Sequence, residues 1–250
     1  MLTNLVIIVA IFVLTSLGTL FLLQKYFASF LFKDHTDFAS SFSDAIGIVF
    51  GLTLAFITIS TWQSYNDVKS SASKEAFSLN SIYRTLDAYP PETRSHGKEL
   101  LQLYVDGVIT KDWPLMAENK YDKPTYDIFN QFHKLLLNYI PKNDGELVAQ
   151  QEELRAISEY RMLRLNRVLS SKSSLDSPMI LALTLSAFLY LFYQCLYSMP
   201  NRKHHKTMIF LLSSSLGIIF YLIYEYITPF SGSNAIGPEE FISVLHNWKI

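Results

Sequence analysis

The side chains with the clearest capacity for chemistry are three arginines in the second half of the chain. Arg161, Arg164 and Arg167 fall within one predicted helix, and two roles are open to them. They could form an electropositive vestibule that concentrates small anions. They could instead pair with carboxylates on neighbouring helices, such as Glu75 and Asp87, where each exposed pair contributes little to stability.

Other reactive side chains give no catalytic or metal-binding pattern. His204 and His205 are adjacent in a short basic segment, where they are poorly placed to converge on one ion, so we interpret the segment as a topology signal. The single cysteine, Cys195, can form neither an internal disulfide nor a cluster of thiolates. The chain has no G-x-S-x-G, H-E-x-x-H, P-loop or Rossmann pattern. We therefore expect no enzymatic activity, no cofactor and no metal, and a net charge of −1 gives no reason to expect nucleic-acid binding.

Four uncharged apolar stretches dominate the architecture. Residues 2–23, 45–62, 178–199 and 207–224 contain no Asp, Glu, Lys or Arg. A hydrocarbon core about 30 Å thick is crossed by about 20 helical residues. The sequence therefore predicts an all-α membrane protein with four transmembrane helices.

Most of the charge lies between the second and third stretches. Residues 64–176 hold 15 of the 21 basic and 16 of the 22 acidic side chains, which predicts a water-exposed helical bundle inserted between two membrane hairpins and continuous with the second and third spans. The expected divisions are a first hairpin at 1–63, the bundle at 64–176, a second hairpin at 177–229 and a C-terminal tail at 230–250.

Helical spacing and prolines predict the elements of this bundle. One long helix, residues 43–89, should run from the second span into the bundle and end at Pro90-Pro91. Its packed seam is expected at Ala72, Ala76, Leu79, Tyr83 and Leu86. Further helices are predicted at 92–111, stopping before Trp113-Pro114, at 125–139, and at 143–170 with a cap at Asn143 or Asp144.

The second span has two distinct faces. One face is apolar and consists of Ile46, Phe50, Leu54 and Ile57. As the lining of a pore these side chains would form a constriction that gates by dewetting, and as ordinary span residues they would face lipid or neighbouring helices. Gly47, Gly51 and Ala55 form a second face of small residues that permits close helix approach.

An ordered set of motifs extends from Phe42 to the C-terminal region. The second apolar run is followed by Trp62 and Tyr65, and then by the pattern E-A-x-x-L-x-x-I-Y-R that ends at Arg84. Trp113-Pro114, the arginine-rich segment at Arg161 and Arg164, and the ending PF-x-G…P-x-x-F follow in order. This order resembles the bestrophin-like family of bacterial and plant membrane proteins of unknown function.

The resemblance implies distant kinship with bestrophins, which are pentameric anion channels. Their second helix lines an apolar neck with an Ile and two Phe at four-residue steps, to which Ile46, Phe50 and Leu54 are similar, although Leu54 departs from the aromatic pattern. By this kinship the chain would be a homo-oligomer, a pentamer by analogy, that lies in the lipid bilayer and conducts small anions such as chloride. The alternative is a non-conducting membrane scaffold or sensor whose bundle binds a protein partner.

The orientation in the membrane has two opposing indications. The predicted short loops hold Lys25, Lys33 and the basic residues of 202–206, so the positive-inside rule favours a cytoplasmic position for these loops. The bundle and both termini would then lie on the non-cytoplasmic side of the cell (inner) membrane. The resemblance implies the reverse, because bestrophins keep the domain between spans two and three in the cytosol.

Overall fold

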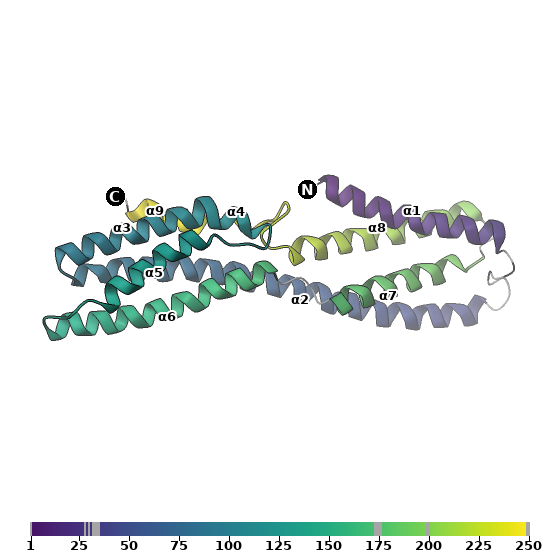
Figure 1. The fold of residues 1–250 in the computed structure, drawn as a ribbon. Coiled ribbons are helices and arrows are strands. Elements are labelled where there is room, and N and C mark those ends of the chain that lie inside the picture. Colours follow the sequence, from purple (N-terminus) through teal and green to yellow (C-terminus); the bar gives the residue numbers. More distant parts are fainter. Residues whose placement is uncertain are drawn as a thin grey trace. The chain divides into compact units, whose positions relative to one another are not determined.

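The computed structural model describes residues 2–27, 29, 31, 36–172, 177–198 and 201–248, and the elements it contains there are helical (Figure 1). The α-helices are α1 (Leu2–Tyr26), α2 (Thr36–Thr85), α3 (Pro91–Gly107), α4 (Trp113–Met116), α5 (Lys123–Leu137), α6 (Asp144–Lys172), α7 (Ser177–Cys195), α8 (Arg202–Ile227) and α9 (Glu239–Trp248). Contacts divide the chain into unit 1, Met1–Ser64 with Ser174–Ile227, and unit 2, Tyr65–Ser173 with Thr228–Ile250. Helix α2 contributes to both units.

Unit 1 contains the apolar helices. α1, α7, α8 and the first part of α2 lie within the segments that are long and apolar enough to cross a membrane. Large apolar side chains remain exposed on all four helices, for example Ile11, Leu52, Phe188 and Leu211, as expected where lipid or another chain replaces water. The predicted four-span all-α fold is therefore confirmed.

Close helix packing in unit 1 depends on a glycine. A Cβ atom added to Gly217 of α8 would lie 2.9 Å from the Cα of Val9 in α1. The two backbones can approach this closely because Gly217 has no side chain. Ser213, one turn earlier on α8, is also fully buried, and its hydroxyl donates to the Ile209 carbonyl at 2.7 Å.

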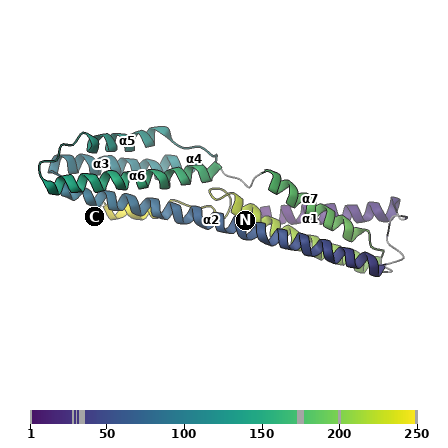
Figure 2. The same ribbon diagram turned by 90° about the horizontal axis from the view of Figure 1, so that it is seen from below.

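Unit 2 is built around the second part of α2. α5 lies alongside α3 and α6 (Figure 2), and the predicted seam residues Ala72, Ala76, Leu79 and Leu86 are buried. Tyr83, the fifth predicted seam residue, is partly buried. The two alanines leave room for neighbouring helices to pack tightly against α2. The helix begins at Thr36, earlier than the predicted residue 43, and a short 3₁₀ helix, Leu86–Ala88, ends it before Pro90.

The C-terminal segment, expected as a tail, forms α9 and packs within unit 2. The indole Nε1 of Trp248 donates to Asn80 Oδ1 at 3.0 Å. The same indole stacks on the ring of Tyr83, with 4.1 Å between the centroids. These contacts attach the end of the chain to α2 by both a polar and an aromatic interaction.

The predicted end of a helix before Trp113-Pro114 is wrong. The chain continues from α3 through a π-helical turn, Val108–Asp112, into α4. In this turn the Trp113 N–H donates to the Val108 carbonyl, five residues earlier. The wider turn accommodates Pro114, which has no N–H of its own and would clash in a regular α-helix.

Two other predicted boundaries have different outcomes. The Asn143 cap of α6 is confirmed, because its Oδ1 accepts from the Glu146 N–H at 2.9 Å. The basic segment expected as a loop is helical from Arg202, so His205 lies in the first turns of α8, where it is buried. Lys33, on which the orientation argument partly depends, lies outside the described residues.

Candidate functional site

A buried ion network connects three helical segments of unit 2. Arg167 of α6 donates from Nε to Glu75 Oε2 at 2.7 Å and from Nη2 to Glu75 Oε1 at 3.1 Å. The same Nη2 donates to Asp112 Oδ2 at 3.1 Å. All three side chains are at most 1% exposed. Asp112 is the last residue of the π-helical turn. The turn therefore also supplies a hydrogen-bond acceptor for Arg167.

Neutral and cationic groups complete this network. The Tyr160 hydroxyl donates to Glu75 Oε1 at 3.2 Å and also contacts the Tyr104 hydroxyl. Arg164 Nη2 lies 4.0 Å from Asp112 Oδ2, and its guanidinium lies over the Tyr126 ring at 4.1 Å. The network thus contains two carboxylates and two guanidinium groups, which balance in charge.

The electrostatics of Arg167 follow from these contacts. Burial alone would lower its pKa, but the carboxylates of Glu75 and Asp112 outweigh burial and raise the pKa. Arg167 is therefore a permanent cation held by two carboxylates. Paired in this way, Arg164 and Arg167 have little positive potential to offer a passing anion, which argues against the vestibule predicted from the sequence for these two residues.

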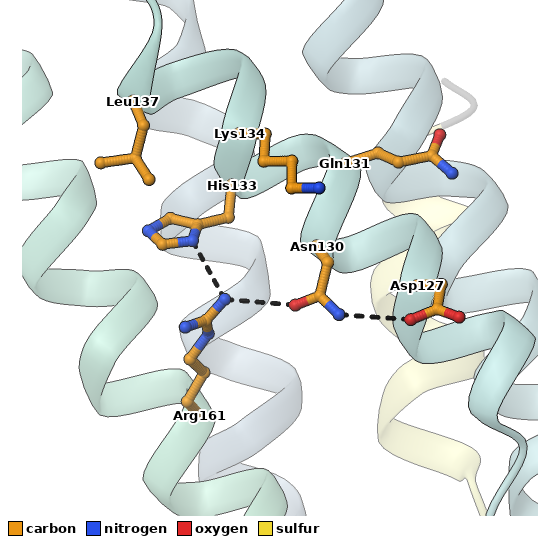
Figure 3. A pocket seen from close by; sticks show the side chains of 7 residues that line it. All are labelled: Asp127, Asn130, Gln131, His133, Lys134, Leu137 and Arg161. Carbon is orange, nitrogen blue, oxygen red and sulfur yellow. Dashed lines mark hydrogen bonds between the residues drawn. The ribbon is translucent and has the colours of Figure 1, made fainter.

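Arg161, the third predicted vestibule residue, has a different environment. It lines an open pocket of about 420 Å³ between α5 and α6, together with Asp127, Asn130, Gln131, His133, Lys134 and Leu137 (Figure 3). Its Nη2 contacts two neutral acceptors, His133 Nδ1 at 3.0 Å and Asn130 Oδ1 at 3.3 Å. The structure therefore separates Arg161 from the other two arginines.

A third buried carboxyl group in unit 2, that of Glu153, was not identified from the sequence. Glu153 of α6 is 1% exposed, and neither carboxyl oxygen has a hydrogen-bond partner among the described residues. Desolvation raises the pKa of Glu153 to about 8, although the nearby Thr85 hydroxyl acts in the opposite direction. Burial, with Glu153 close by, also raises the pKa of Tyr89. The sequence shows Glu153 beside Glu152 in a charged helix and gives no sign that only Glu153 is buried.

In unit 1 the predicted pore-lining residues pack inside the subunit. Phe50, Leu54 and Ile57 are about 5% exposed. They form one apolar cluster with α7 and α8, whose members are Leu183, Ala187, Leu191, Leu216 and Ile223. Ile46, the fourth predicted residue, lies at the edge of this face and is 37% exposed.

The opposite side of α2 is not covered by any other described part of the chain. This surface, here called the open face of α2, consists of Asp44, Ile48, Gly51, Leu52, Ala55 and Phe56, all exposed. Ile48, Leu52 and Phe56 are 63–69% exposed. A Cβ atom added to Gly51 would meet nothing within 4 Å, whereas one added to Gly47 would lie 3.2 Å from the Tyr190 ring. The two glycines predicted to share one small-residue face therefore have different surroundings.

A small polar pocket lies beside this face. It has a volume of about 300 Å³, and its lining includes Asp44, Gln194 and His205. The side-chain amide of Gln194 donates from Nε2 to Ser43 Oγ at 2.6 Å. His205 Nε2 lies 3.2 Å from the backbone carbonyl of Gln194. The part of the chain that the structure describes holds no group of three or more His, Cys, Asp or Glu side chains placed to bind a metal ion.

The fold defines the class of protein: an all-helical membrane protein whose chain combines four spans with a second helical unit. The chain belongs to the Bestrophin-like family, because the model of the Bestrophin-like domain matches residues 10–241. No curated protein matches it.

Solved structures show the same fold at low identity. A point mutant of a bacterial Bestrophin homolog from Klebsiella pneumoniae aligns with a TM-score of 0.75 and 12% identity over 98% of this chain and 97% of that one. A second mutant of that homolog aligns with a TM-score of 0.62 and 14% identity over 99% of this chain and 96% of that one. The structure of a membrane protein mutant aligns with a TM-score of 0.73 and 13% identity over 96% of this chain and 95% of that one. The TM-scores establish the shared fold, and at such low identity the activity has to be argued from this chain.

Proposed function

We propose that this protein is an oligomeric ion channel of a cell (inner) membrane, with the α2 helices of several copies lining the conduction path. The observation that supports this proposal is the open face of α2. Gly51 and Ala55 are exposed within a membrane span, and small residues on such a surface favour close approach of another helix over contact with lipid. The other side of α2 already packs against α7 and α8 through Phe50, Leu54 and Ile57, so we propose a second copy as the partner for the open face.

The structure favours different neck residues from those predicted. Phe50, Leu54 and Ile57 pack against α7 and α8 within one chain, which argues against a pore-lining role for them. Ile48, Leu52 and Phe56 are exposed at four-residue steps, and this is the spacing that the resemblance to bestrophins implied for an apolar neck. Water and ions leave such a narrow apolar constriction readily, so these residues would hold the closed state.

The conducted ions that we propose are small anions such as chloride, and the assembly that we propose is a pentamer. Both proposals rest on the family relation. Of the three arginines predicted to attract anions, Arg161 is the one without a carboxylate within 4.0 Å among the described residues. We assign no enzymatic reaction to this chain.

The test compares two leucines on opposite sides of α2. In liposomes that contain the purified oligomer, Leu52→Ser should increase ion flux because a hydroxyl makes the neck easier to wet. Leu54→Ser should instead destabilise unit 1, because Leu54 is 6% exposed and lies in its apolar core. Greater ion flux in Leu54→Ser than in Leu52→Ser would indicate that the face with Leu54, and not the open face of α2, lines the neck. An assembled oligomer that passes no ions in any form would support the scaffold or sensor alternative.

A further inference from the structure

Arg161 differs from the other arginines of α6 in its partners. Arg167 binds Glu75 and Asp112, and Arg164 lies 4.0 Å from Asp112. Arg155, whose side chain is 84% exposed, lies 3.7 Å from Glu159. Within the described residues, Arg161 has no carboxylate within ion-pair distance, although it is only partly exposed. A partly buried cation without an anion is costly, and an external anion would remove that cost.

The surrounding hydrogen bonds hold the guanidinium in place without neutralising it. Because an arginine can only donate, His133 Nδ1 must accept from Arg161 Nη2, so the ring is neutral and carries its proton on Nε2. Burial, assisted by Arg161, lowers the pKa of His133 and maintains this form. On the other side, Asn130 presents its oxygen to Arg161 and its Nδ2 to Asp127 Oδ1 at 3.4 Å. Figure 3 shows Asn130 between Arg161 and the carboxylate of Asp127.

The pocket retains donors that these contacts do not use. Arg161 Nε is buried and has no hydrogen-bond partner among the described residues. Lys134, Gln131 and His133 also line the pocket and add an ammonium group, an amide and an imidazole N–H. Several donors with two positive charges suit a group with three or more oxygens and a double negative charge. The volume of about 420 Å³ also exceeds what a monatomic ion requires.

We propose that the pocket between α5 and α6 binds a phosphoryl group, with Arg161 as the main ligand and Lys134 as a second cation. Among the described residues Arg161 Nη1 makes no hydrogen bond, so this charged group can donate to the oxygens of a phosphate, and Lys acts as a point charge beside it. Asp127 restricts where in the pocket an anion can bind, because its carboxylate repels anions at its own end. The ligand therefore sits at the Arg161 end. This site recognises a ligand within unit 2, and it does not depend on the proposed channel.

The test is a titration of the full-length protein in detergent with inorganic phosphate, by calorimetry at constant ionic strength. We expect saturable binding that weakens at least about tenfold in Arg161→Met and about threefold in Lys134→Gln. Arg155→Met removes an exposed arginine of the same helix and should leave the affinity unchanged. Arg161→Lys should fall between the parent and Arg161→Met, because it keeps the charge and loses the guanidinium that His133 and Asn130 hold in place. Circular dichroism and the unfolding midpoint identify any variant that has lost its fold.

Two further titrations identify the ligand and its source. Tighter binding of succinate than of phosphate would overturn the assignment to a phosphoryl group in favour of a carboxylate. In nanodiscs, phosphatidic acid that competes with inorganic phosphate in the parent but not in Arg161→Met supports this site with a lipid headgroup as its occupant. Phosphate binding that is equal in phosphatidic acid and phosphatidylcholine supports it with a soluble phosphate. No saturable binding by the parent, or equal affinity in Arg161→Met, would overturn the proposal.

Discussion

The guanidinium of Arg167 donates to both carboxylate oxygens of Glu75, at 2.7 and 3.1 Å, and both side chains are completely buried. This pair joins α6 to α2 across 92 positions of the sequence. Asp112 and Arg164 extend it to the π-helical turn. Breaking a buried pair from one side leaves an uncompensated charge, and that loss exceeds what the pair itself contributes to stability.

Arg167→Met should therefore destabilise unit 2 by about 3–5 kcal/mol, because Glu75 and Asp112 would remain buried without their partner. Chemical unfolding of the purified protein in detergent measures the change. Arg155→Met, at an exposed pair on the same helix, should change the free energy of unfolding by about 0.5 kcal/mol or less. Equal losses in the two variants would show that the buried network does not stabilise the unit.

The raised pKa of Glu153 predicts that the free energy of unfolding decreases as the pH rises. Its pKa is raised from 4.5 to about 8 in the folded protein, so the folded state holds a proton that the unfolded chain releases between these values. Its effect on stability is therefore most favourable below pH 4.5, becomes less favourable as pH rises, and levels off above about 8.

Glu153→Gln should remove this dependence and raise the free energy of unfolding at pH 7 by up to about 3 kcal/mol. Unfolding curves at several pH values between 5 and 9 provide the measurement (about one unit apart suffices for a titration of this width). Glu152→Gln, at the exposed neighbouring position, serves as the control and should leave the pH profile unchanged. A profile that Glu153→Gln does not flatten would exclude Glu153 as its source.

Gly217 tests the close packing of α1 on α8. Alanine usually favours a helix over glycine by about 1 kcal/mol, yet Gly217→Ala should destabilise unit 1, because the new Cβ would lie 2.9 Å from the Val9 Cα. Gly18→Ala in α1 meets nothing within 4 Å and should follow the helix propensity instead. Thermal unfolding in detergent compares the two variants. If Gly217→Ala proves as stable as Gly18→Ala, the helices are not in this close contact.

The orientation that we propose places unit 2 on the non-cytoplasmic side, in accordance with the positive-inside rule. In a Cys195→Ala background, Lys120→Cys should react with a membrane-impermeant thiol reagent in intact cells with a permeabilised outer membrane, and Lys203→Cys should not. Both positions are exposed. Labelling of Lys203→Cys alone would reverse the orientation and agree with the one that bestrophin kinship implies.

The sequence by itself determined the spans and the ends of several helices, because those features depend on local chemistry. Charge-free apolar stretches correspond to α1, α7, α8 and the first part of α2. The long helix gives way to a 3₁₀ turn shortly before Pro90, which could not continue it, and Asn143 caps α6 through its own side chain. The residues that carried the family resemblance were also sufficient to identify the family, since the family model matches residues 10–241.

Only the tertiary structure decided which face of each helix is covered. Both sides of α2 within the membrane span are apolar, so periodicity could not show that Leu54 packs inside the subunit while Leu52 remains open. Arg161 and Arg167 are equivalent in the sequence. They differ because the π-helical turn brings Asp112 to Arg167, whereas α5 presents only neutral acceptors, Asn130 and His133, to Arg161. A charge acquires its role from partners on other helices, and the packing of those helices is not encoded in its local sequence.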